Sequence, residues 1–215
     1  MAFDKARPPP WGKICDMDEP TTPRPRKKRD RARTESDLFD AVERLLERDG
    51  ILAGLNLNEV AAEANVNRGQ IYQLFGSRQE LLRAALADRL AGLASQSPDH
   101  WNVPFAERRR RLMQASLSGK WMAFMAMLAL DGDEQLSIFS EPDEMTAALQ
   151  RDKAYGALPP DVDAEALHVL TAATVAGYAI FRRVVASDIG VPLAELDERV
   201  VAAYDYLLSR VTEKD

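Results

Sequence analysis

The sequence predicts an all-α protein with a small three-helix head and a larger helical body. Beyond residue 33, apolar residues recur at the three- and four-residue spacing of one helix face, as they do over residues 38–46. No segment alternates apolar and polar residues in the manner of a half-buried strand. Proline, Asp-Gly and Ser-Pro-Asp sequences separate the helical segments.

Residues 1–33 are predicted to form a disordered basic arm. They contain six of the twelve prolines and no sustained apolar period. Residues 24–33 carry a net charge of +6, whereas the whole chain carries −6. A basic arm on an acidic body favours anion binding at this end, and a solvated tail is the alternative.

The composition argues against several classes of site. The single cysteine, Cys15, rules out an internal disulfide, and two histidines are too few for a Cys/His metal cluster. The most apolar run, residues 121–130, is too short to span a bilayer. We therefore expect a cytoplasmic protein with no metal, no cofactor and no membrane association.

The head, residues 34–80, is marked by four helix-start signals. In each signal a capping residue is followed three positions later by an acid or an amide, which satisfies the first backbone N–H groups of a helix. The pairs are Thr34 with Asp37, Asn56 with Glu59, Asn67 with Gln70, and Ser77 with Glu80. They predict four consecutive helices, the last of which continues to residue 95.

The second and third signals are only eleven residues apart, which leaves room for a short helix and a tight turn. Asn65 lies at that turn, and asparagine tolerates the left-handed conformation that such a turn often needs. The inward-facing positions are apolar: Val60, Ala61, Ala64, Val66, Ile71, Leu74 and Phe75. Two short helices joined in this way predict a helix-turn-helix.

The outward face of its second helix carries side chains that can read double-stranded DNA. Arginine can grip a guanine edge, and Gln or Asn can pair with adenine in the major groove. The outward residues are Asn67, Arg68, Gly69, Gln70, Tyr72 and Gln73. The helix N-termini at Asn56, Asn67 and Ser77 can also direct N–H groups at phosphates.

These residues together resemble the DNA-binding signature of the TetR family of bacterial regulators. The similar positions are Val60-Ala61, Ala64-Asn65-Val66-Asn67, Gly69, Ile71-Tyr72, Phe75 and Ser77-Arg78-Gln79-Glu80-Leu81. The resemblance covers residues 34–86, a quarter of the chain. It implies a dimeric transcriptional regulator whose body senses a small molecule.

The resemblance also implies roles for single residues. Asn56 would cap its helix beside a phosphate, Tyr72 would pack against the DNA backbone, and Arg78 would contact a phosphate. Leu74 replaces a frequent aromatic and puts the contact of that aromatic in doubt. We also expect the basic arm to contact the minor groove or the DNA backbone. Its candidate residues are Arg26, Lys27, Lys28, Arg29 and Arg31.

The other two departures from the family pattern preserve the backbone geometry that we expect. Asn65 stands where glycine is usual, and Asn67 stands where Ser or Thr is common. Both residues suit a tight turn followed by a helix start.

The body, residues 81–215, is predicted to contain further helices at 104–117, 119–130, 142–155, 163–186 and 192–211. Residues 121–130 are apolar all round, which indicates a buried helix that forms either plain core or the wall of a pocket. The predicted effector pocket is formed by Trp101, Phe105, Trp121, Phe124, Met125, Leu128, Phe139 and Tyr178. The effector is expected to be small and apolar.

Two polar features of the body are given structural interpretations. Arg108 to Arg111 are adjacent and point around a helix, so we expect a solvated face with one or two salt bridges to the acidic body. His168 is expected to be satisfied by a hydrogen-bond partner, and an effector contact is the alternative.

The last two helices predict an association surface. One apolar stripe contains Leu167, Leu170, Thr174, Gly177, Tyr178 and Phe181, and the other contains Val200, Tyr204, Leu207, Leu208 and Val211. Paired with a second copy, the stripes would form a four-helix bundle, whereas packing within one chain is the alternative. A homodimer would present two heads to a near-palindromic site.

The sequence therefore favours a DNA-binding transcriptional regulator, a repressor that a small molecule releases from a palindromic operator. Two other classes of function were weighed. An all-α enzyme has no local catalytic motif or phosphate loop to support it. A protein-interaction module would favour an apolar outer face in place of Arg68 and its polar neighbours. Repression and activation are not distinguished by these residues.

Overall fold

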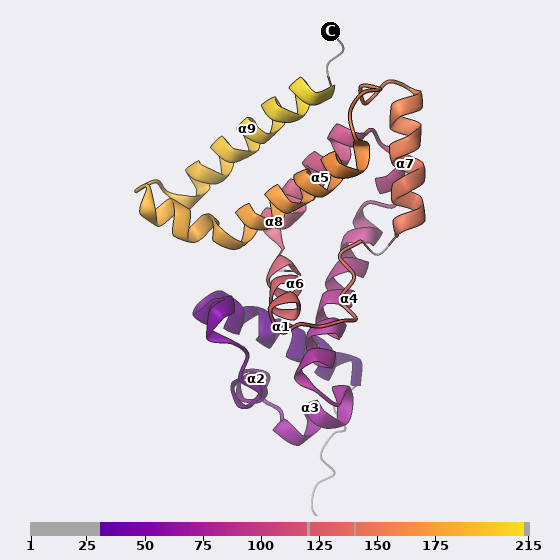
Figure 1. Ribbon diagram of the computed structural model, residues 1–215. Coiled ribbons are helices and arrows are strands. Elements are labelled where there is room, and N and C mark those ends of the chain that lie inside the picture. The colour runs from indigo at the N-terminus through magenta and orange to yellow at the C-terminus, as the bar shows by residue number, and fades with distance from the viewer. Residues whose placement is uncertain (1–30, 120, 140, 213–215) are drawn as a thin grey trace, which may run out of the picture. The chain divides into compact units, whose positions relative to one another are not determined.

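Helices account for nearly all of the regular structure, and no strand occurs in residues 31–119, 121–139 and 141–212 (Figure 1). These are the residues that the computed structural model describes, and they belong to one compact unit, Arg31–Asp215. The prediction of an all-α fold is confirmed.

Three helices and the start of a fourth build the head. They are α1 (Arg31–Asp49), α2 (Leu57–Glu63), α3 (Arg68–Phe75) and the first turn of α4 (Arg78–Gln96), with a short 3-10 turn, η1 (Ile51–Ala53), after α1. Leu38 and Val42 of α1, Val60 of α2 and Ile71 of α3 are fully buried and pack in one core. The two short helices are therefore held against a long one by apolar burial.

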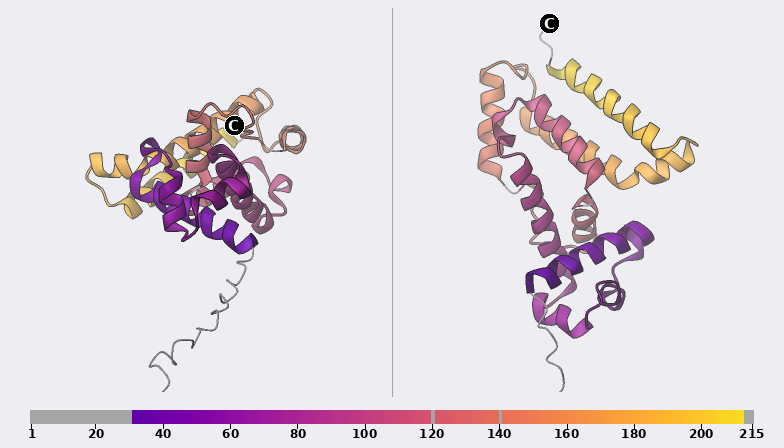
Figure 2. Two further views of the ribbon diagram at one scale, coloured as in Figure 1. Left: turned by 90° about the horizontal axis from the view of Figure 1, so that it is seen from below. Right: turned by 180° about the vertical axis from the view of Figure 1, so that it is seen from behind.

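The body consists of the rest of α4 and five further helices. After a 3-10 turn, η2 (His100–Asn102), these are α5 (Phe105–Ser118), α6 (Trp121–Leu130), α7 (Pro142–Ala154), α8 (Ala164–Asp188) and α9 (Leu193–Thr212). All five lie where the periodicity predicted them. Helix α4 packs against α6, while α5 packs against both α8 and α9, and α8 and α9 run antiparallel (Figure 2).

Three of the four predicted helix starts are confirmed, because Asn56, Asn67 and Ser77 are the capping residues of α2, α3 and α4. The start at Thr34 is wrong. Helix α1 is already formed at Arg31, and Thr34 is a buried residue inside it. Its side chain faces the apolar core, so this threonine belongs to the inner face of the helix.

Helix α4 joins the head to the body without a break. It begins after its cap at Ser77 and continues to Gln96. The predicted division between residues 80 and 81 therefore falls within its first turn. The separation of head and body into distinct domains stays a prediction.

Candidate nucleic-acid interface and internal chamber

The turn between α2 and α3 has the conformation that its sequence predicted. Asn65 has a φ of 52°, in the left-handed region that asparagine tolerates. The Val66 N–H donates to the Ala61 carbonyl over 2.9 Å, which closes the turn. Ala61, Ala64 and Ile71 are buried on its inner side. These two short helices and their turn form the predicted helix-turn-helix.

A reciprocal capping box fixes the start of α3. The Asn67 side-chain oxygen accepts from the Gly69 N–H at 2.8 Å, and the Gln70 side-chain oxygen accepts from the Asn67 N–H at 3.0 Å. A Cβ atom at position 69 would lie 3.3 Å from that same asparagine oxygen, so glycine fits the cap closely. Asn67 and Gln70 were predicted as base-reading residues, yet both use their acceptor oxygens to hold the helix start.

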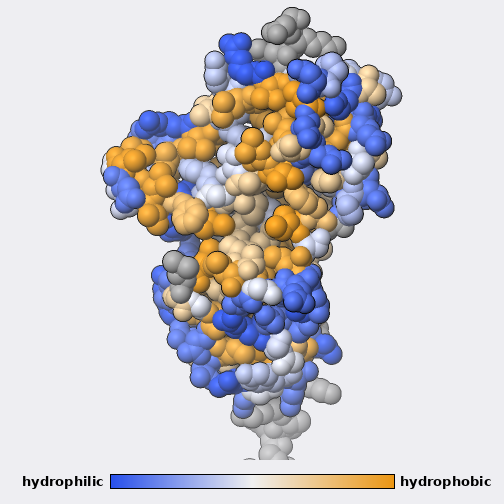
Figure 3. Space-filling model, viewed as in Figure 1, coloured by the Kyte–Doolittle hydropathy of each residue, from blue (hydrophilic) through white to orange (hydrophobic). Residues whose placement is uncertain are grey.

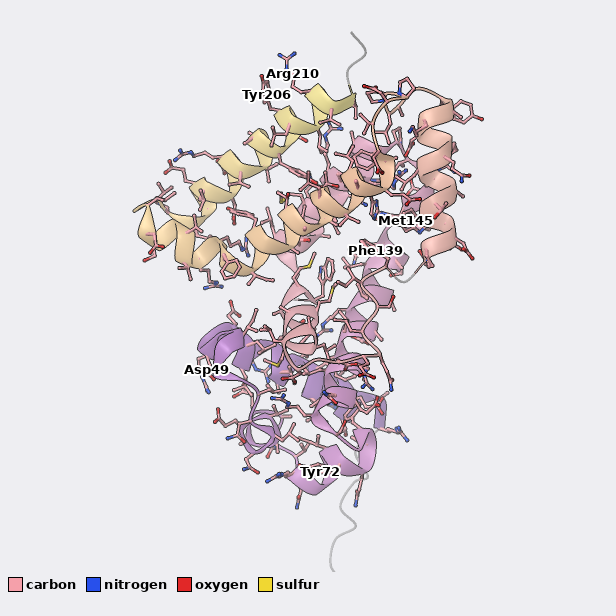
Figure 4. All side chains as sticks on the ribbon, in the orientation of Figure 1. Asp49, Tyr72, Phe139, Met145, Tyr206 and Arg210 are labelled. Atoms are coloured by element: carbon pink, nitrogen blue, oxygen red, sulfur yellow. The ribbon has the colours of Figure 1, made fainter. Side chains whose placement is uncertain are left out.

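The outer face of α3 holds Arg68 in a fixed arrangement. Its guanidinium donates to the Tyr72 hydroxyl at 2.9 Å and to the Asn58 side-chain oxygen at 3.1 Å. The same group lies 5.4 Å from the centre of the Tyr72 ring, within the range of a cation–π contact. Tyr72 is 43% exposed and lies at the end of the head remote from α9 (Figure 4). Gln73 is also exposed.

Asn58 is a residue of this face that the sequence interpretation missed. It belongs to α2 and reaches Arg68 across the turn. Its backbone N–H also donates to the Asn56 cap at 2.9 Å. The only signal in the sequence is its position two residues after a capping residue, which does not by itself predict a contact with the next helix.

The flanking residues that were expected to meet phosphates have contacts within the head. The Asn56 side chain caps α2 and also donates to Glu59 at 3.2 Å, and the Ser77 hydroxyl accepts from the Glu80 N–H at 3.1 Å. Arg78 forms an ion pair with Asp131, just after α6. A phosphate contact by Arg78 therefore has to share or replace that carboxylate.

Most of the predicted DNA arm, Arg26, Lys27, Lys28 and Arg29, lies outside the described residues. Arg31, the last residue of that set, is part of α1 and pairs with Glu35 one turn later at 2.8 Å. Arg31 and Arg33 therefore do not belong to a disordered arm, which is a correction to the predicted boundary at residue 33.

The body contains a partly open chamber of about 500 Å³, a volume within the range of small-molecule sites. Its wall is mostly apolar and comes from α4, α5, α6, α8 and the segments next to α4 and α7. The residues that line it include Leu90, Leu93, Ala94, His100, Trp101, Arg109, Leu112, Trp121, Met122, Met125, Phe139, Glu141, His168 and Ala176. In Figure 4, Phe139 lies on the segment that leads from α6 to α7.

Four of the eight predicted pocket residues are brought together around this chamber: Trp101, Trp121, Met125 and Phe139. The other four have different surroundings. Phe105, Phe124 and Leu128 are fully buried in the core and do not line the chamber. Tyr178 donates to Asp197 at 2.8 Å, and its burial together with this carboxylate raises the pKa of its hydroxyl. A helical run that is apolar all round does not reveal which side meets a cavity.

The predicted solvated face at Arg108 to Arg111 is wrong for the first two arginines. Arg108 is fully buried, pairs with the buried carboxylate of Asp152 and donates to the Val103 carbonyl. Arg109 is 2% exposed and lines the chamber.

The other two arginines of the run form the salt bridges that were expected. Arg110 pairs with Asp205 at 2.6 Å, and Arg111 pairs with Asp99 at 2.8 Å.

His168 also differs from its predicted state. It is buried in the chamber wall, with its ring 5.2 Å from the ring of Phe139, and its Nδ1 has no hydrogen-bond partner among the described residues. Burial, followed by the charges of Arg109 and Arg108, lowers the pKa of His168 to about 3. The imidazole is therefore neutral at physiological pH and is not the partner-satisfied histidine that we expected.

Apolar side chains remain exposed on α8 and α9. Leu170 and Phe181 of the predicted α8 stripe are 64% and 60% exposed, and Leu207 of α9 is 58% exposed. Figure 3 shows hydrophobic residues gathered over this part of the unit. Tyr204 and Leu208, in contrast, are buried within the chain, so the α9 stripe serves partly as intrachain packing.

Helix α8 is also the one described helix that is long and apolar enough to cross a membrane. This assignment rests on length and composition alone, and only 17% of its apolar window is buried within the chain.

The head matches a known family. Residues 38–85 match the model of bacterial regulatory proteins of the tetR family, which confirms the resemblance drawn from the helix-turn-helix. The match covers the head and the first part of α4 and none of the chamber lining. Among curated proteins, none matches the chain.

Solved structures share the fold of the whole described unit. Salmonella enterica GusR is 14% identical, with a TM-score of 0.58 over 86% of this chain and 98% of that one. The ketosteroid transcriptional regulator KstR2 of Mycobacterium tuberculosis is 17% identical, with a TM-score of 0.56 over 84% and 95%. A TetR-family transcriptional regulator from Haemophilus influenzae is 18% identical, with a TM-score of 0.51 over 84% and 99%. At these identities the likeness is one of fold.

Proposed function

We propose that this chain, a DNA-binding transcriptional regulator with the helix-turn-helix of the TetR family, is a cytoplasmic homodimeric repressor that a small molecule releases from a palindromic operator. The observation that carries the proposal is the combination, in one unit, of an exposed reading helix and a mostly apolar chamber. Helix α4 connects the two. Enzymatic turnover is not part of the proposal.

The arrangement of Arg68 supports DNA reading by α3. Its contacts with Asn58 and Tyr72 hold the guanidinium on the exposed face before DNA arrives. A preorganised arginine loses less side-chain freedom on binding, and its planar group can pair with both acceptors of a guanine edge. One short helix makes only a few such contacts, so a second head is needed for an operator of useful affinity.

The exposed apolar face of α8 and α9 supports dimerisation. Leu170, Phe181 and Val184 recur at helical spacing and are 59–64% exposed, while Thr174 and Gly177 between them permit close approach. A contiguous apolar surface of this kind marks an association site in soluble proteins. Packing against the same face of a second copy would produce a four-helix bundle and a two-fold pair of heads.

Helix α4 supports communication between the chamber and the head. Leu90, Leu93 and Ala94, near its C-terminal end, line the chamber. Arg78, in its first turn, pairs with Asp131, and Arg83 pairs with Asp133 at 2.8 Å. A ligand that displaces the chamber end of α4 therefore changes the position of the head. Effector and DNA would then oppose each other reciprocally.

Selection of bound sequences from random duplex DNA, at moderate salt and with the full chain, tests the DNA-binding part. We expect one inverted repeat to be enriched and to bind two chains. Leu170→Glu with Phe181→Glu should give a folded monomer that loses this binding. Failure to enrich any sequence, or full binding by a monomer, would contradict the proposal.

A reporter gene with the selected operator across its promoter tests the sign of regulation. Repression predicts lower reporter output when the chain is present and recovery when Arg68→Ala is introduced. Higher output with the wild-type chain would identify an activator.

A further inference from the structure

Two neighbouring arginines of α5 have opposite surroundings. Arg108 is paired with Asp152 and bonded to a backbone carbonyl. Arg109 is almost as deeply buried, at 2% exposure, yet it has no ion pair, and its Nε and Nη1 atoms have no hydrogen-bond partner in the described ranges. Its guanidinium lies 5.7 Å from the centre of the Phe105 ring and borders the chamber.

Arg109 remains charged in this position. Burial lowers its pKa to about 10, opposed by Tyr204 and with a smaller contribution from Arg108, and this value is still well above physiological pH. A buried charge without a partner destabilises a fold strongly. We therefore expect a negatively charged group from outside the chain to pair with Arg109.

The nearby carboxylates do not supply it. Asp152 is held by Arg108, and Asp99 is held by Arg111. Glu141, on the chamber wall, is exposed and accepts a hydrogen bond from the Trp101 indole. None of these three carboxylates forms an ion pair with Arg109.

Two other polar atoms of the chamber wall also have no partner within the described residues: Nε1 of Trp121, which is a donor, and Nδ1 of His168. A trapped water molecule can bond to such atoms, but it cannot neutralise the guanidinium. The remaining wall near these groups is apolar, with Met125 and Phe139 among its members. A ligand with negatively charged oxygens and an apolar body would satisfy the polar atoms of the chamber and pack against its apolar wall.

We propose that the effector is an amphiphilic organic anion, a hydrocarbon or aromatic body with one carboxylate or sulfonate head, and that Arg109 pairs with the head. This inference rests on the proposed function, because it assigns the chamber to the effector. It replaces the expectation of a purely apolar effector. The chamber volume suits one such molecule. An acidic side chain of a second copy is a poor substitute, because Arg109 is only 2% exposed in the chamber wall.

A pair of fluorescent dyes that differ only in the charged head tests the charge requirement. 8-Anilinonaphthalene-1-sulfonate carries a sulfonate, and N-phenyl-1-naphthylamine has the same rings without it. Binding to the full chain is counted as the portion that dodecanoate displaces, which separates the chamber from the exposed face of α8. We expect one sulfonate dye per chain, and Arg109→Gln should weaken it by at least about tenfold while leaving the neutral dye unchanged.

Control variants separate a ligand-binding role from a structural one. Arg110→Gln removes the next arginine, which pairs with Asp205 away from the chamber, and should leave both dyes unchanged. Arg109→Met should raise the Tm of the ligand-free protein by a few degrees, because it removes an uncompensated buried charge. A structural arginine would lower the Tm when replaced. Arg109→Lys should retain part of the preference for the sulfonate.

Several outcomes would overturn the proposal. They are equal affinity of the wild-type chain for the two dyes, absence of displaceable binding by either dye, and an Arg109→Gln variant that keeps the preference. None of these measurements uses DNA. If dodecanoate binds through Arg109 but the operator complex persists, the release mechanism fails and the anion site stands. If neutral compounds release the operator from the wild-type chain and from Arg109→Gln equally well, the repressor stands and the anion site fails.

Discussion

The head and the chamber use arginine in opposite ways. In the head, Arg68 is exposed and is held by an amide and a tyrosine, so its charge is solvated and its direction is fixed. In the chamber, Arg109 is buried and lacks an acceptor among the described residues, so its charge is destabilising until a ligand enters. The exposed group suits a large polyanion that approaches from outside. The buried group suits a small anion that the chain can enclose.

Arg108 lies between these two cases, since it is buried and paired, and breaking its pair gives the largest expected effect on stability. Asp152→Ala leaves the buried guanidinium without its carboxylate, which should lower the free energy of unfolding by about 3–5 kcal/mol. Urea unfolding of the full chain measures this. Asp205→Ala, which breaks the partly exposed pair with Arg110, should change it by less than about 1 kcal/mol. Equal losses in the two variants would show that burial does not distinguish the pairs.

Removal of the exposed arginine should affect binding and leave stability nearly unchanged. Arg68→Ala is expected to weaken operator binding by about 1–3 kcal/mol for each half-site, at least tenfold overall, because it removes a two-bond contact with a base. Lys153→Ala, an exposed residue of α7 away from the head and from the proposed dimer face, serves as the control. Fluorescence anisotropy on the selected operator measures both variants. If Arg68→Ala lowers Tm as much as it lowers affinity, its role is structural.

The buried histidine of the chamber wall should make the stability of the fold depend on pH. The pKa of His168 is lowered from its ordinary value of 6.5 to about 3, so the unfolded chain binds this proton first as the pH falls. The stability of the fold therefore decreases between pH 6.5 and pH 3. Between pH 7 and pH 5 this one group should lower the free energy of unfolding by about 1–2 kcal/mol. His168→Gln should remove that decrease, and an unchanged pH profile in this variant would contradict the burial of a neutral imidazole.

The smallest effect is expected at the turn of the head. Asn65→Ala places alanine at a φ of 52° and should destabilise the fold by about 1 kcal/mol. Asn65→Gly should be nearly neutral, since glycine relieves the strain but gives the unfolded chain more freedom. Thermal unfolding of the two variants compares them. A glycine variant less stable than the alanine variant would show that left-handed backbone strain at this position is not what limits the stability of the turn.

Local signals made the head highly predictable from the sequence. Caps such as Asn67 and the left-handed Asn65 act through neighbours one to five residues away, so their spacing alone identifies the elements. The start at Thr34 failed because a capping residue type also fits the inner face of a helix. The contact between Asn58 and Arg68 was not predictable, since it depends on the angle between two helices.

The chamber was predictable only in part. Trp121 and Met125 lie on an apolar run that had to be buried, but the run is apolar on every side and does not indicate which side faces a cavity. We predicted a solvated face for the run of four arginines because charged side chains usually lie at the protein surface. The burial of Arg108 depends on Asp152, forty-four residues later. The burial of Arg109 depends on the packing of α5 against α8 and α9. Contacts between residues so far apart in the sequence cannot be predicted from the spacing of neighbouring residues.

The capping box of α3 has a consequence for how the operator preference of such a protein can diverge. Asn67 and Gln70 are constrained by the helix start, so most substitutions there are expected to damage the fold before they alter recognition. Arg68, Tyr72 and Gln73 carry no such constraint. A library randomised at these three positions should therefore yield variants of near wild-type stability with new target sequences, whereas variants at Asn67 and Gln70 should each lose about 0.5–2 kcal/mol of stability with the cap.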